Sequence, residues 1–393
     1  MVVSEGNSRI DLVYFAPVGP GGLSKYAVAQ CAELAVMGCR VIFLGRRHMR
    51  SELCRKCPSV QFEELIELPE VKGGFARLLR WVRTCRSEVA QLRNCAANMK
   101  PRAVLITAFA EYFAPFWSYM LRRLRLSGVR IGVVVHDPVR DFRIGPRWWH
   151  QFCISDAYSV VDIAFTHDET ALDTGWPARK INRAVIPHGC YQLPLPEPLP
   201  LKRDIRGAVG IPLGAKVALS FGHIRDGKNL HLVIRAMAHQ QDIHLLVVGK
   251  EQSASQKPIS YYQKLAEQLG VESRCHWVHG FVPEENAHRY FIAADVLVLL
   301  YSGDFKSASG VLNDAAQFGL KVLCSSGGGP LQSVVEQYRL GCWIPPDDLT
   351  GICAALASIA SEAAHVPDWE KYRSDHSWLR NAETVQKFLL DSP

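Results

Sequence analysis

The sequence predicts an α/β protein with two domains, each built around a parallel β-sheet that helices cover on both faces. Short apolar runs alternate with helical stretches along the whole chain, which is the order that parallel sheets need. The runs are rich in Val, Ile and Leu almost without interruption, as in strands buried on both faces. A segment with four prolines at every second position, YQLPLPEPLPLKRD at 191–204, separates two halves of similar size and is expected to be an extended, stiff linker.

Each strand is predicted from a short apolar run bounded by glycine, proline or polar residues. In the first half we expect strands at 10–17, 40–45, 103–109, 130–136, 162–167 and 183–189. In the second half we expect strands at 216–222, 244–250, 275–280, 295–302 and 321–326.

Each helix is predicted from apolar residues that recur at helical spacing between the strands. We expect helices at 23–37, 72–93, 230–239, 261–269, 286–293, 311–318 and 349–361. Ligands of such sheets bind beyond the carboxyl ends of the strands. The functional residues are therefore expected in the loops that follow the strands and face a cleft between the domains.

The composition excludes several classes of protein. Hydrophobic residues make up 48% and charged residues 21% of the 393 residues, which excludes disordered, collagen-like and coiled-coil chains. Residues 1–190 hold 26 Lys and Arg against 17 Asp and Glu, whereas the rest of the chain holds 19 against 21. This basic surplus of the first half either marks a surface for an anionic partner or is an uneven division that any two-domain protein can have.

The cysteines and the first residues favour a reducing cytoplasm. The twelve cysteines show no disulfide framework, and Cys54 and Cys57, the one close pair, lack a second pair at metal-binding spacing. The segment MVVSEGNSRIDLVYFAP places a carboxylate within what would be the apolar part of a secretory signal. We therefore expect a cytoplasmic protein with free thiols and no bound metal.

A glycine-rich loop, PVGPGGLSKY at 17–26, joins the first strand to the first helix. Gly19, Gly21 and Gly22 let a ligand approach the backbone at the positive end of the helix dipole. The loop lacks the full dinucleotide-binding pattern, and any tight turn from strand to helix also favours glycine. It is therefore either a ligand-binding loop or only a tight turn.

A second loop, SFGHIRDGKN at 220–229, places Arg225 and Lys228 just beyond a strand. Two cations at the carboxyl end of a strand suit a diphosphate. The alternative is a solvated loop, which is what single charges in loops usually form.

A third segment at 301–335 has small residues before a helix predicted to begin at Val311. The unpaired amides near Ser309 can bind an anion, and Asp314, expected in the first turn, can accept hydrogen bonds from a ribose diol. The glycines at 327–329 form a second loop on the same edge. Alternatively, Ser309 is only an N-cap and Asp314 only complements the helix dipole.

Taken together and in this order, these segments resemble family 4 glycosyltransferases of the GT-B fold, over nearly the whole chain. The glycine loop at 19–22 resembles the family's first-strand loop, and VIPHGCY at 185–191 resembles its V-I-P-N-G-V-D segment. FGHIRDGKN resembles its F-x-G-R-L-x-x-x-K-G segment, and GFVPEENAHRYFIAADVLVLL at 280–300 resembles the segment whose opening backbone reads the nucleobase. SASGVLNDAAQFGLKVL resembles its E-G-F-G-L-x-x-L-E-A-M-A-x-G-x-P-V segment.

The resemblance implies two Rossmann-like domains that face a cleft, with a C-terminal helix returning to the N-terminal domain. An acceptor-binding domain is expected at 1–190 with a returning tail at about 370–393, and a nucleotide-sugar-binding domain at 205–369. The implied reaction is retaining transfer of a sugar from a nucleotide sugar to a saccharide or lipid-linked acceptor, in polysaccharide or glycolipid synthesis. It needs neither a cofactor nor a metal, and the nucleotide can be of the UDP, GDP or dTDP type.

The resemblance also assigns roles, because cations and helix amides are expected to stabilise the diphosphate leaving group. The expected catalytic residues are His136, Asp137, Arg225 and Lys228, although a His–Asp pair at a strand end can also be a local hydrogen-bonded pair. The expected donor-binding residues are Gly21, Gly22, Gly222, His223, Gly249, Phe281, Val282, Lys306, Ser307, Ser309, Gly310, Val311 and Asp314. The expected acceptor-binding residues are Glu111, also a candidate acid or base, and Arg140.

The chain departs from the family at three of these positions. The two family glutamates align with Lys306 and Asp314, so that the first is reversed in charge while the second keeps a carboxylate for the ribose. The reversal puts the donor sugar and catalysis in doubt, and a uronic acid carboxylate is one partner that Lys306 suits. The family arginine aligns with His223, and Arg225 is expected to supply the missing cation.

The basic first half has two candidate anionic partners. In the helical segment 72–93 the apolar residues Phe75, Leu78, Leu79, Val82 and Val89 share one face, with Arg77 and Arg80 opposite and Trp81 at the border. With 122–125 this segment suits the anionic inner leaflet of a membrane, although a helix packed on a core shows the same pattern. Nucleic acid is not expected, since the sequence has no recognised module or stacking platform.

Other functions on the same fold stay open at this point. A nucleotide-sugar epimerase would convert the donor without an acceptor. A non-catalytic nucleotide-sugar-binding protein is suggested by Lys306. A dehydrogenase is disfavoured because neither half has the dinucleotide fingerprint.

Overall fold

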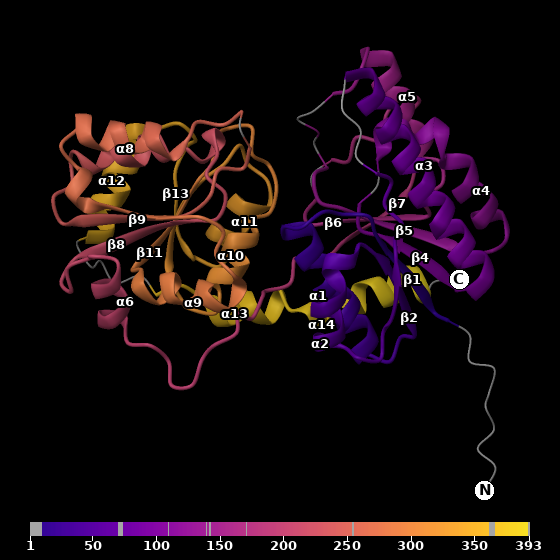
Figure 1. Ribbon diagram of the computed structural model, residues 1–393, viewed down its shortest axis with the longest axis horizontal. Helices are drawn as coiled ribbons and strands as arrows, with labels where there is room; N and C mark the ends of the chain where they lie inside the picture. Colours follow the sequence, from indigo (N-terminus) through magenta and orange to yellow (C-terminus); the bar gives the residue numbers. More distant parts are fainter. Residues whose placement is uncertain are drawn as a thin grey trace, which may run out of the picture. The chain divides into compact units, whose positions relative to one another are not determined.

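The computed structural model describes residues 10–69, 74–108, 110–138, 140, 143–169, 171–253, 255–360 and 366–391. The chain divides into two compact units, Met1–Gly189 with His376–Pro393 (unit 1) and Cys190–Asp375 (unit 2). Each unit is built on one parallel β-sheet with helices packed on it, which confirms the predicted α/β class (Figure 1).

The sheet of unit 1 has seven strands in the order β3-β2-β1-β4-β5-β6-β7, and every neighbouring pair is parallel. The strands are β1 Leu12–Ala16, β2 Val41–Gly45, β3 Gln61–Glu64, β4 Ala103–Ile106, β5 Arg130–Val135, β6 Ile163–Thr166 and β7 Asn182–Val185. The helices are α1 Gly22–Val36, α2 Arg50–Lys56, α3 Gly74–Met99, α4 Ser118–Leu126, α5 Arg147–Tyr158 and α14 Trp378–Val385, with the short turns η1 Arg47–Met49 and η2 Glu111–Phe116 and a last π-helical turn, η5 Gln386–Leu390.

The sheet of unit 2 has six parallel strands in the order β10-β9-β8-β11-β12-β13. The strands are β8 Lys216–Phe221, β9 Ile243–Gly249, β10 Cys275–His279, β11 Val296–Leu300, β12 Lys321–Ser325 and β13 Gly341–Trp343. The helices are α6 Lys202–Ala208, α7 Leu230–Met237, α8 Ile259–Gln268, α9 Glu284–Ala293, α10 Gly310–Ala315, α11 Pro330–Gln337, α12 Leu349–Ala360 and α13 Trp369–Asp375, with the turns η3 Asp226–Lys228 and η4 Glu272–Arg274.

The strands are apolar throughout because successive side chains enter different cores on the two faces of the sheet. In β1, Leu12, Tyr14 and Ala16 belong to one core cluster of unit 1, whereas Val13 and Phe15 belong to the other. All five side chains are buried, and each large apolar side chain so placed contributes about 2 kcal/mol. Unit 2 has the same pair of cores on its sheet.

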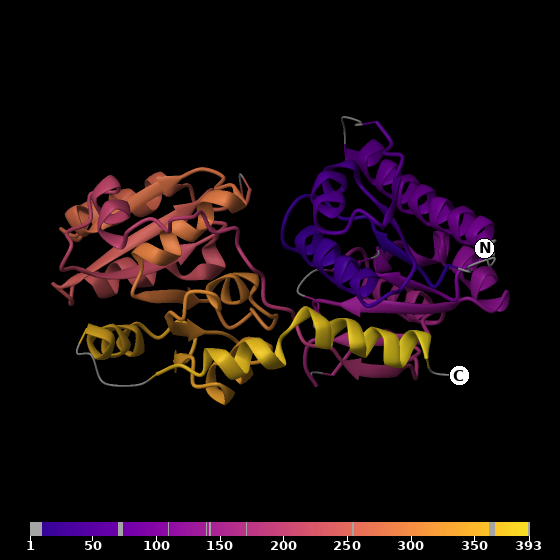
Figure 2. The same ribbon diagram turned by 90° about the horizontal axis from the view of Figure 1, so that it is seen from below.

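The end of the chain passes from unit 2 to unit 1. Helix α13 belongs to unit 2, and α14 packs against α1 in unit 1, where the yellow C-terminal helix of Figure 2 runs along it. Asn381 of α14 is fully buried, and Leu389 of η5 lies so close to β5 that a Cβ built on Gly132 would be 2.9 Å from Leu389 Cδ2. Glycine in β5 therefore makes room for the last turn of the chain.

Several details differ from the sequence-based expectations. Strands β3 and β13 and helices α2, α5 and α11 were not predicted. Helix α6 begins at Lys202, inside the segment 191–204 expected to be extended. The strand expected at 103–109 ends at Ile106. Helix α10 has no acidic residue in its first turn, so the placement of Asp314 there was wrong; Asp314 is the fifth residue of α10.

The long helix α3 corrects one further expectation. Leu78 and Leu79, assigned to one apolar face together with Val82 and Val89, are each 42% exposed, whereas Val89 is buried. Arg80, assigned to the polar face, is half-buried and donates a hydrogen bond to the carbonyl oxygen of Leu68 at 3.1 Å. The helix therefore packs on the core only beyond its first turns.

Candidate active site

The carboxyl end of β8 places a lysine beside the start of α10. Lys228 Nζ donates a hydrogen bond to the carbonyl oxygen of Phe221, the last residue of β8, at 2.7 Å. A Cβ built on Gly222, which has a φ of 91°, would lie 3.4 Å from Lys228 Nζ and 3.6 Å from Val311 Cγ2. Glycine at 222 thus brings three of the predicted site residues together. Burial and the neighbouring charge of Arg225 lower the pKa of Lys228 to about 7.

The turn that carries Lys228 is held from its outer side. Asp226 accepts hydrogen bonds from the amide of Lys257 at 3.1 Å and from the hydroxyl of Tyr262 at 3.3 Å. Asn229 has a φ of 51° and donates to Asp347 at 2.8 Å. The sequence between β8 and α7 therefore folds into a fixed turn rather than a freely solvated loop.

Arg225 lies over an aromatic shelf that the sequence reasoning missed. Its guanidinium carbon is 5.5 Å from the ring centroids of both Tyr301 and Phe305, and the two rings are stacked with centroids 3.8 Å apart. In the described part of the chain no carboxylate forms an ion pair with Arg225. The aromatic faces hold the guanidinium without neutralising it, so its charge is available to an anion. An aromatic residue directly after strand β11 was the signal that could have found this shelf.

Ser309 is the N-cap of α10. Its Oγ lies 3.1 Å from the hydroxyl of Tyr301 and accepts a hydrogen bond from the amide of Leu312 at 3.4 Å. The side chain is buried, so a ligand reaches Ser309 only through its backbone. Around the same helix start, Gly310 is exposed, whereas Ser307, Val311 and Asp314 are half-buried.

The loop after β9 requires glycine. A Cβ built on Gly249, which has a φ of 148°, would lie 1.9 Å from the carbonyl oxygen of Gly222, and no side chain fits at that distance. The two predicted donor-binding glycines thus pack against each other.

Phe281 and Val282 follow β10 on the same edge of the sheet. Phe281 is 76% exposed and lies 5.7 Å from Lys250 Nζ, while Val282 packs against the core of unit 2. His223, at the end of β8, is exposed, and burial and the nearby cations lower its pKa. The expected role of 281–282 toward the nucleobase stays a prediction.

Lys306 is exposed, and among the described residues nothing accepts a hydrogen bond from its ammonium group or forms an ion pair with it. Its backbone is fixed, since a Cβ built on Gly329 would lie 2.7 Å from the carbonyl oxygen of Lys306. The loop at 327–329 therefore sets the position of Lys306 and leaves its charge unpaired.

In the glycine loop of unit 1, the backbone conformation requires glycine at only one position. Gly21 has a φ of 146°, which other residues rarely adopt, and its amide and carbonyl both bond to Ser24 Oγ at the start of α1. At Gly19 and Gly22 a Cβ would meet nothing within 4 Å. Gly22 thus keeps open space beside the helix rather than avoiding a clash.

Three histidines gather at the carboxyl ends of β5, β6 and β7. The ring centroids of His136, His167 and His188 lie 4.6, 5.5 and 5.1 Å from the ring of Tyr26 in α1. Burial lowers the pKa of His167 to about 4 and that of His188 to about 3, and it lowers that of His136 well below its usual range. All three imidazoles are therefore neutral near pH 7. His167 and His188 were not predicted as site residues, although they lie near the ends of the strands predicted at 162–167 and 183–189.

The neutral imidazoles form a hydrogen-bonded relay whose direction the geometry fixes. His167 Nδ1 donates to the carbonyl oxygen of Ile186 at 3.1 Å, so His167 Nε2 accepts from His136 Nδ1 at 3.2 Å. His136 Nε2 then faces Thr107 Oγ1 at 3.4 Å as an acceptor. Because this last contact is long, His136 Nε2 is the position in the relay where another hydroxyl can most readily donate. Asp137 follows at an exposed position.

A buried amide network holds Tyr26 against the returning helix. Asn381 Nδ2 donates to the Tyr26 hydroxyl at 2.8 Å and to the carbonyl oxygen of Pro187 at 2.7 Å. Gln30 Nε2 donates to Asn381 Oδ1 at 2.7 Å, and Gln30 Oε1 accepts from Tyr14 at 2.7 Å. The histidine cluster therefore rests on a scaffold that includes the C-terminal helix.

Glu111 and Arg140, the two residues expected to bind the acceptor, bind each other. Arg140 Nε lies 2.5 Å from Glu111 Oε2, and the Tyr158 hydroxyl donates to Glu111 Oε1 at 2.8 Å. Although burial opposes it, the Glu111 carboxylate raises the pKa of Arg140 above its usual range. The pair is mostly buried, so it fixes the loop after β5, and its role toward an acceptor stays a prediction.

In the described part of the chain, no group of three or more His, Cys, Asp or Glu side chains is placed to hold a metal ion. No helix there is both long and apolar enough to cross a bilayer.

Comparison with solved structures shows the same architecture in glycosyltransferases. A glycosyltransferase from Rickettsia africae superposes with a TM-score of 0.72 at 13% identity, over 98% of this chain and 100% of that one. HepE from Anabaena, in complex with UDP and glucose, superposes with a TM-score of 0.72 at 14% identity, again over 98% and 100%. Two parallel-sheet units with this topology define the GT-B class, so the predicted fold is confirmed.

Sequence comparison finds a family match in unit 2. Residues 202–375, nearly all of unit 2 but less than half of the chain, match the family described as glycosyl transferases group 1. A D-inositol 3-phosphate glycosyltransferase from Corynebacterium urealyticum is 25% identical over 245 residues, which are 61% of this chain and 57% of that protein. The chain thus matches little more than half the length of this relative.

Proposed function

We propose that this chain is a retaining glycosyltransferase that moves a sugar from a nucleotide sugar to a saccharide or lipid-linked acceptor. The observation that carries the proposal is the grouping of Lys228, Gly222 and Val311 at the end of β8, with the unpaired Arg225 nearby. Two cations beside a helix start suit the diphosphate of the donor. The HepE structure in complex with UDP and glucose supports a nucleotide-sugar donor.

The proposed reaction needs no side-chain nucleophile. The acceptor hydroxyl oxygen forms a bond to the anomeric carbon as the bond from that carbon to the diphosphate oxygen breaks. The hydroxyl proton passes to a phosphate oxygen, and attack on the leaving-group face retains the configuration. Arg225 and Lys228 stabilise the negative charge that develops on the nucleoside diphosphate, while His136 Nε2 accepts a hydrogen bond from a sugar hydroxyl.

A donor screen followed by a transfer assay tests the proposal. Thermal shifts with UDP, GDP, dTDP and their sugars identify the nucleotide, and release of the nucleoside diphosphate is then measured with and without an acceptor. Arg225→Gln is expected to lower kcat by about a hundredfold, whereas Arg235→Gln, an exposed arginine on α7, leaves it unchanged. If both variants release the nucleoside diphosphate as fast as the wild type, the assignment of Arg225 is wrong.

The unpaired charge of Lys306 favours a second candidate, a protein that binds nucleotide sugars without transferring them. Calorimetry that shows binding without transfer or hydrolysis would support it, and conversion of the donor without any acceptor would indicate an epimerase. Within the first proposal, Lys306 pairs with a donor carboxylate such as that of a uronic acid. This pairing is excluded if Lys306→Glu leaves the preference among donors unchanged.

We further propose that unit 1 attaches peripherally to an anionic membrane. Trp148, Phe152 and Phe116 are 70%, 45% and 41% exposed, and Trp149 joins them through ring contacts of 5.9 to 6.3 Å. Exposed aromatic side chains of this kind bind at the headgroup level of bilayers. The segment 122–125 contributes less than expected, because Asp156 and Asp162 pair with two of its arginines.

Co-sedimentation with vesicles that contain anionic lipid tests the attachment. Trp148→Ser is expected to weaken binding severalfold, whereas Leu213→Ser, 64% exposed in unit 2, leaves it unchanged. If the wild type does not sediment at low salt, the attachment is ruled out.

A further inference from the structure

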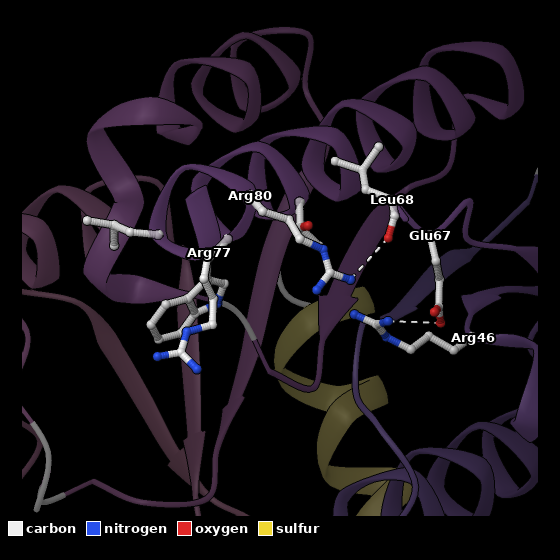
Figure 3. A pocket seen from close by; sticks show the side chains of 8 residues that line it. Arg46, Glu67, Leu68, Arg77 and Arg80 are labelled. Atoms are coloured by element: carbon white, nitrogen blue, oxygen red, sulfur yellow. Dashed lines mark hydrogen bonds and ion pairs between the residues drawn. The ribbon is translucent and has the colours of Figure 1, made fainter. Parts of the chain in front are cut away.

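A cavity of about 520 Å³ opens in unit 1 at the carboxyl ends of β2 and β3, beside the start of α3 (Figure 3). It is lined by Arg46 from the end of β2, by Glu67 and Leu68 from the segment after β3, and by Arg77, Leu78, Arg80, Trp81 and Thr84 from α3. Strands β1 and β4 separate β2 and β3 from β5–β7, which carry the histidine cluster. The cavity is therefore a second place on this sheet edge, of a size that holds a small organic ligand.

The charges of the cavity are only partly compensated. Arg46 pairs with both nearby carboxylates, Glu67 at 2.8 Å and Glu88 at 2.6 Å. Arg77 is exposed and makes no hydrogen bond or ion pair with any described residue. Arg80 has the carbonyl oxygen of Leu68 as its hydrogen-bond acceptor, so no carboxylate balances it. Among the described residues, Arg77 and Arg80, on neighbouring turns of α3, thus have no carboxylate partner, whereas Arg46 has two, so the three arginines exceed the two carboxylates by one charge.

The arginines also offer hydrogen-bond donors with no acceptor. In the described structure, Arg46 Nε and Arg80 Nε are buried and have no hydrogen-bond partner. A buried N–H group without an acceptor is unfavourable.

One part of the cavity wall is apolar and exposed to solvent. Leu78 and Trp81 are each 42% exposed, although α3 lies on a folded domain. The Trp81 ring is fixed against Phe113 of η2 at a centroid distance of 4.9 Å. Large apolar side chains exposed beside a charged cavity are typical of a binding site for a ligand with both kinds of surface.

We infer that this cavity binds a phosphate monoester that carries an apolar chain. A phosphate monoester has close to two negative charges at neutral pH and three acceptor oxygens, which suits two guanidinium groups that have no carboxylate partner among the described residues. A neutral sugar would leave both of these arginines without an anionic partner. The apolar chain covers Leu78 and Trp81. The inference does not rest on the proposed function, since binding at this cavity needs no donor and no transfer.

Calorimetry with hexyl phosphate, inorganic phosphate and hexanol, at pH 7.5 and about 0.15 M salt, tests the site. Hexyl phosphate is expected to bind at least about tenfold more tightly than inorganic phosphate, and hexanol is expected not to bind. Equal affinity for the two phosphates would overturn the part played by the apolar chain. Absence of binding by hexyl phosphate at millimolar concentration would overturn the site itself.

Variants on α3 assign the binding to these residues. Arg77→Gln is expected to weaken hexyl phosphate about tenfold without affecting the fold, because Arg77 has no partner to lose. Arg83→Gln, an exposed arginine on the same helix outside the cavity lining, is the matched control. Leu78→Ser is expected to weaken hexyl phosphate and leave inorganic phosphate unchanged. If Arg77→Gln and Arg83→Gln bind hexyl phosphate alike, the assignment of the cavity is wrong.

Discussion

Raising the pH from 7 to 9 is expected to weaken binding of a nucleotide sugar by up to about fiftyfold, through the titration of Lys228. Because burial and Arg225 lower the pKa of this lysine to about 7, about half of the free protein carries its charge at pH 7 and about one hundredth at pH 9. A bound diphosphate beside the ammonium group favours the charged form, so the complex keeps its proton. The free protein must therefore take up a proton to bind.

Calorimetry in two buffers of different ionisation enthalpy measures this uptake directly. At pH 8 the free lysine is about one tenth protonated, so each binding event should take up about 0.9 of a proton. Lys228→Met is expected to bind more weakly and to take up none, whereas Arg235→Gln behaves as the wild type. An affinity that stays constant from pH 7 to 9, with an enthalpy independent of the buffer, would refute the placement of Lys228 against the diphosphate.

The stability of the free protein should change in the opposite direction. The pKa of Lys228 in the unfolded chain is 10.5, above its folded value of about 7, so the unfolded chain binds more protons between these values. The free energy of unfolding therefore rises as the pH increases from 7 toward 10.5. Urea unfolding of the wild type and of Lys228→Met separates this effect from other titrating groups.

Three further predictions concern stability and are measured by urea unfolding. Gly249→Ala should destabilise unit 2 by about 2–4 kcal/mol, because the added Cβ would meet a carbonyl oxygen at 1.9 Å, whereas Gly207→Ala, with open space around it, should not. Asn381→Ala should destabilise unit 1 by about 2–3 kcal/mol through lost buried hydrogen bonds, with the exposed Glu383→Ala as its control; equal effects would contradict the network. His167, with its pKa lowered from 6.5 to about 4, should contribute about 3 kcal/mol to the free energy of unfolding above pH 6.5, and this contribution is lost as the pH falls through 4. If the free energy of unfolding falls with pH equally in the wild type and in His167→Phe, His167 is not buried as a neutral group.

The fold was predictable where the signal was local. Apolar runs placed β1 and β8 closely, because strands buried on both faces must be apolar along their whole length. Strand β3, with the sequence QFEE, escaped because it is an edge strand with no fully buried side chain. Strand β13 is only three residues long, which is too short for a pattern.

The site was predictable only in part, because many of its contacts join residues far apart in the chain. Lys228 and Gly222 were found in one loop, but the shelf of Tyr301 and Phe305 under Arg225 depends on how two loops meet. The hydrogen bond from Gln30 to Asn381 spans 351 residues, and no local pattern marks either amide. Gly21 was recognisable from its residue type, because glycine adopts the positive φ observed there far more readily than other residues.

The return of the chain to unit 1 affects the order in which the protein can fold during synthesis. Most of unit 1 is made before unit 2, yet unit 1 lacks α14 until all of unit 2 has been made. Until then Gln30 and Tyr26 have no Asn381 to bond, and the apolar positions that Leu389 later covers remain open. Domains usually fold as units from the N-terminus during translation, whereas here unit 2 is the first that can be complete. The nascent unit 1 is thus a partly open domain, and α14 closes it only after unit 2 has been made.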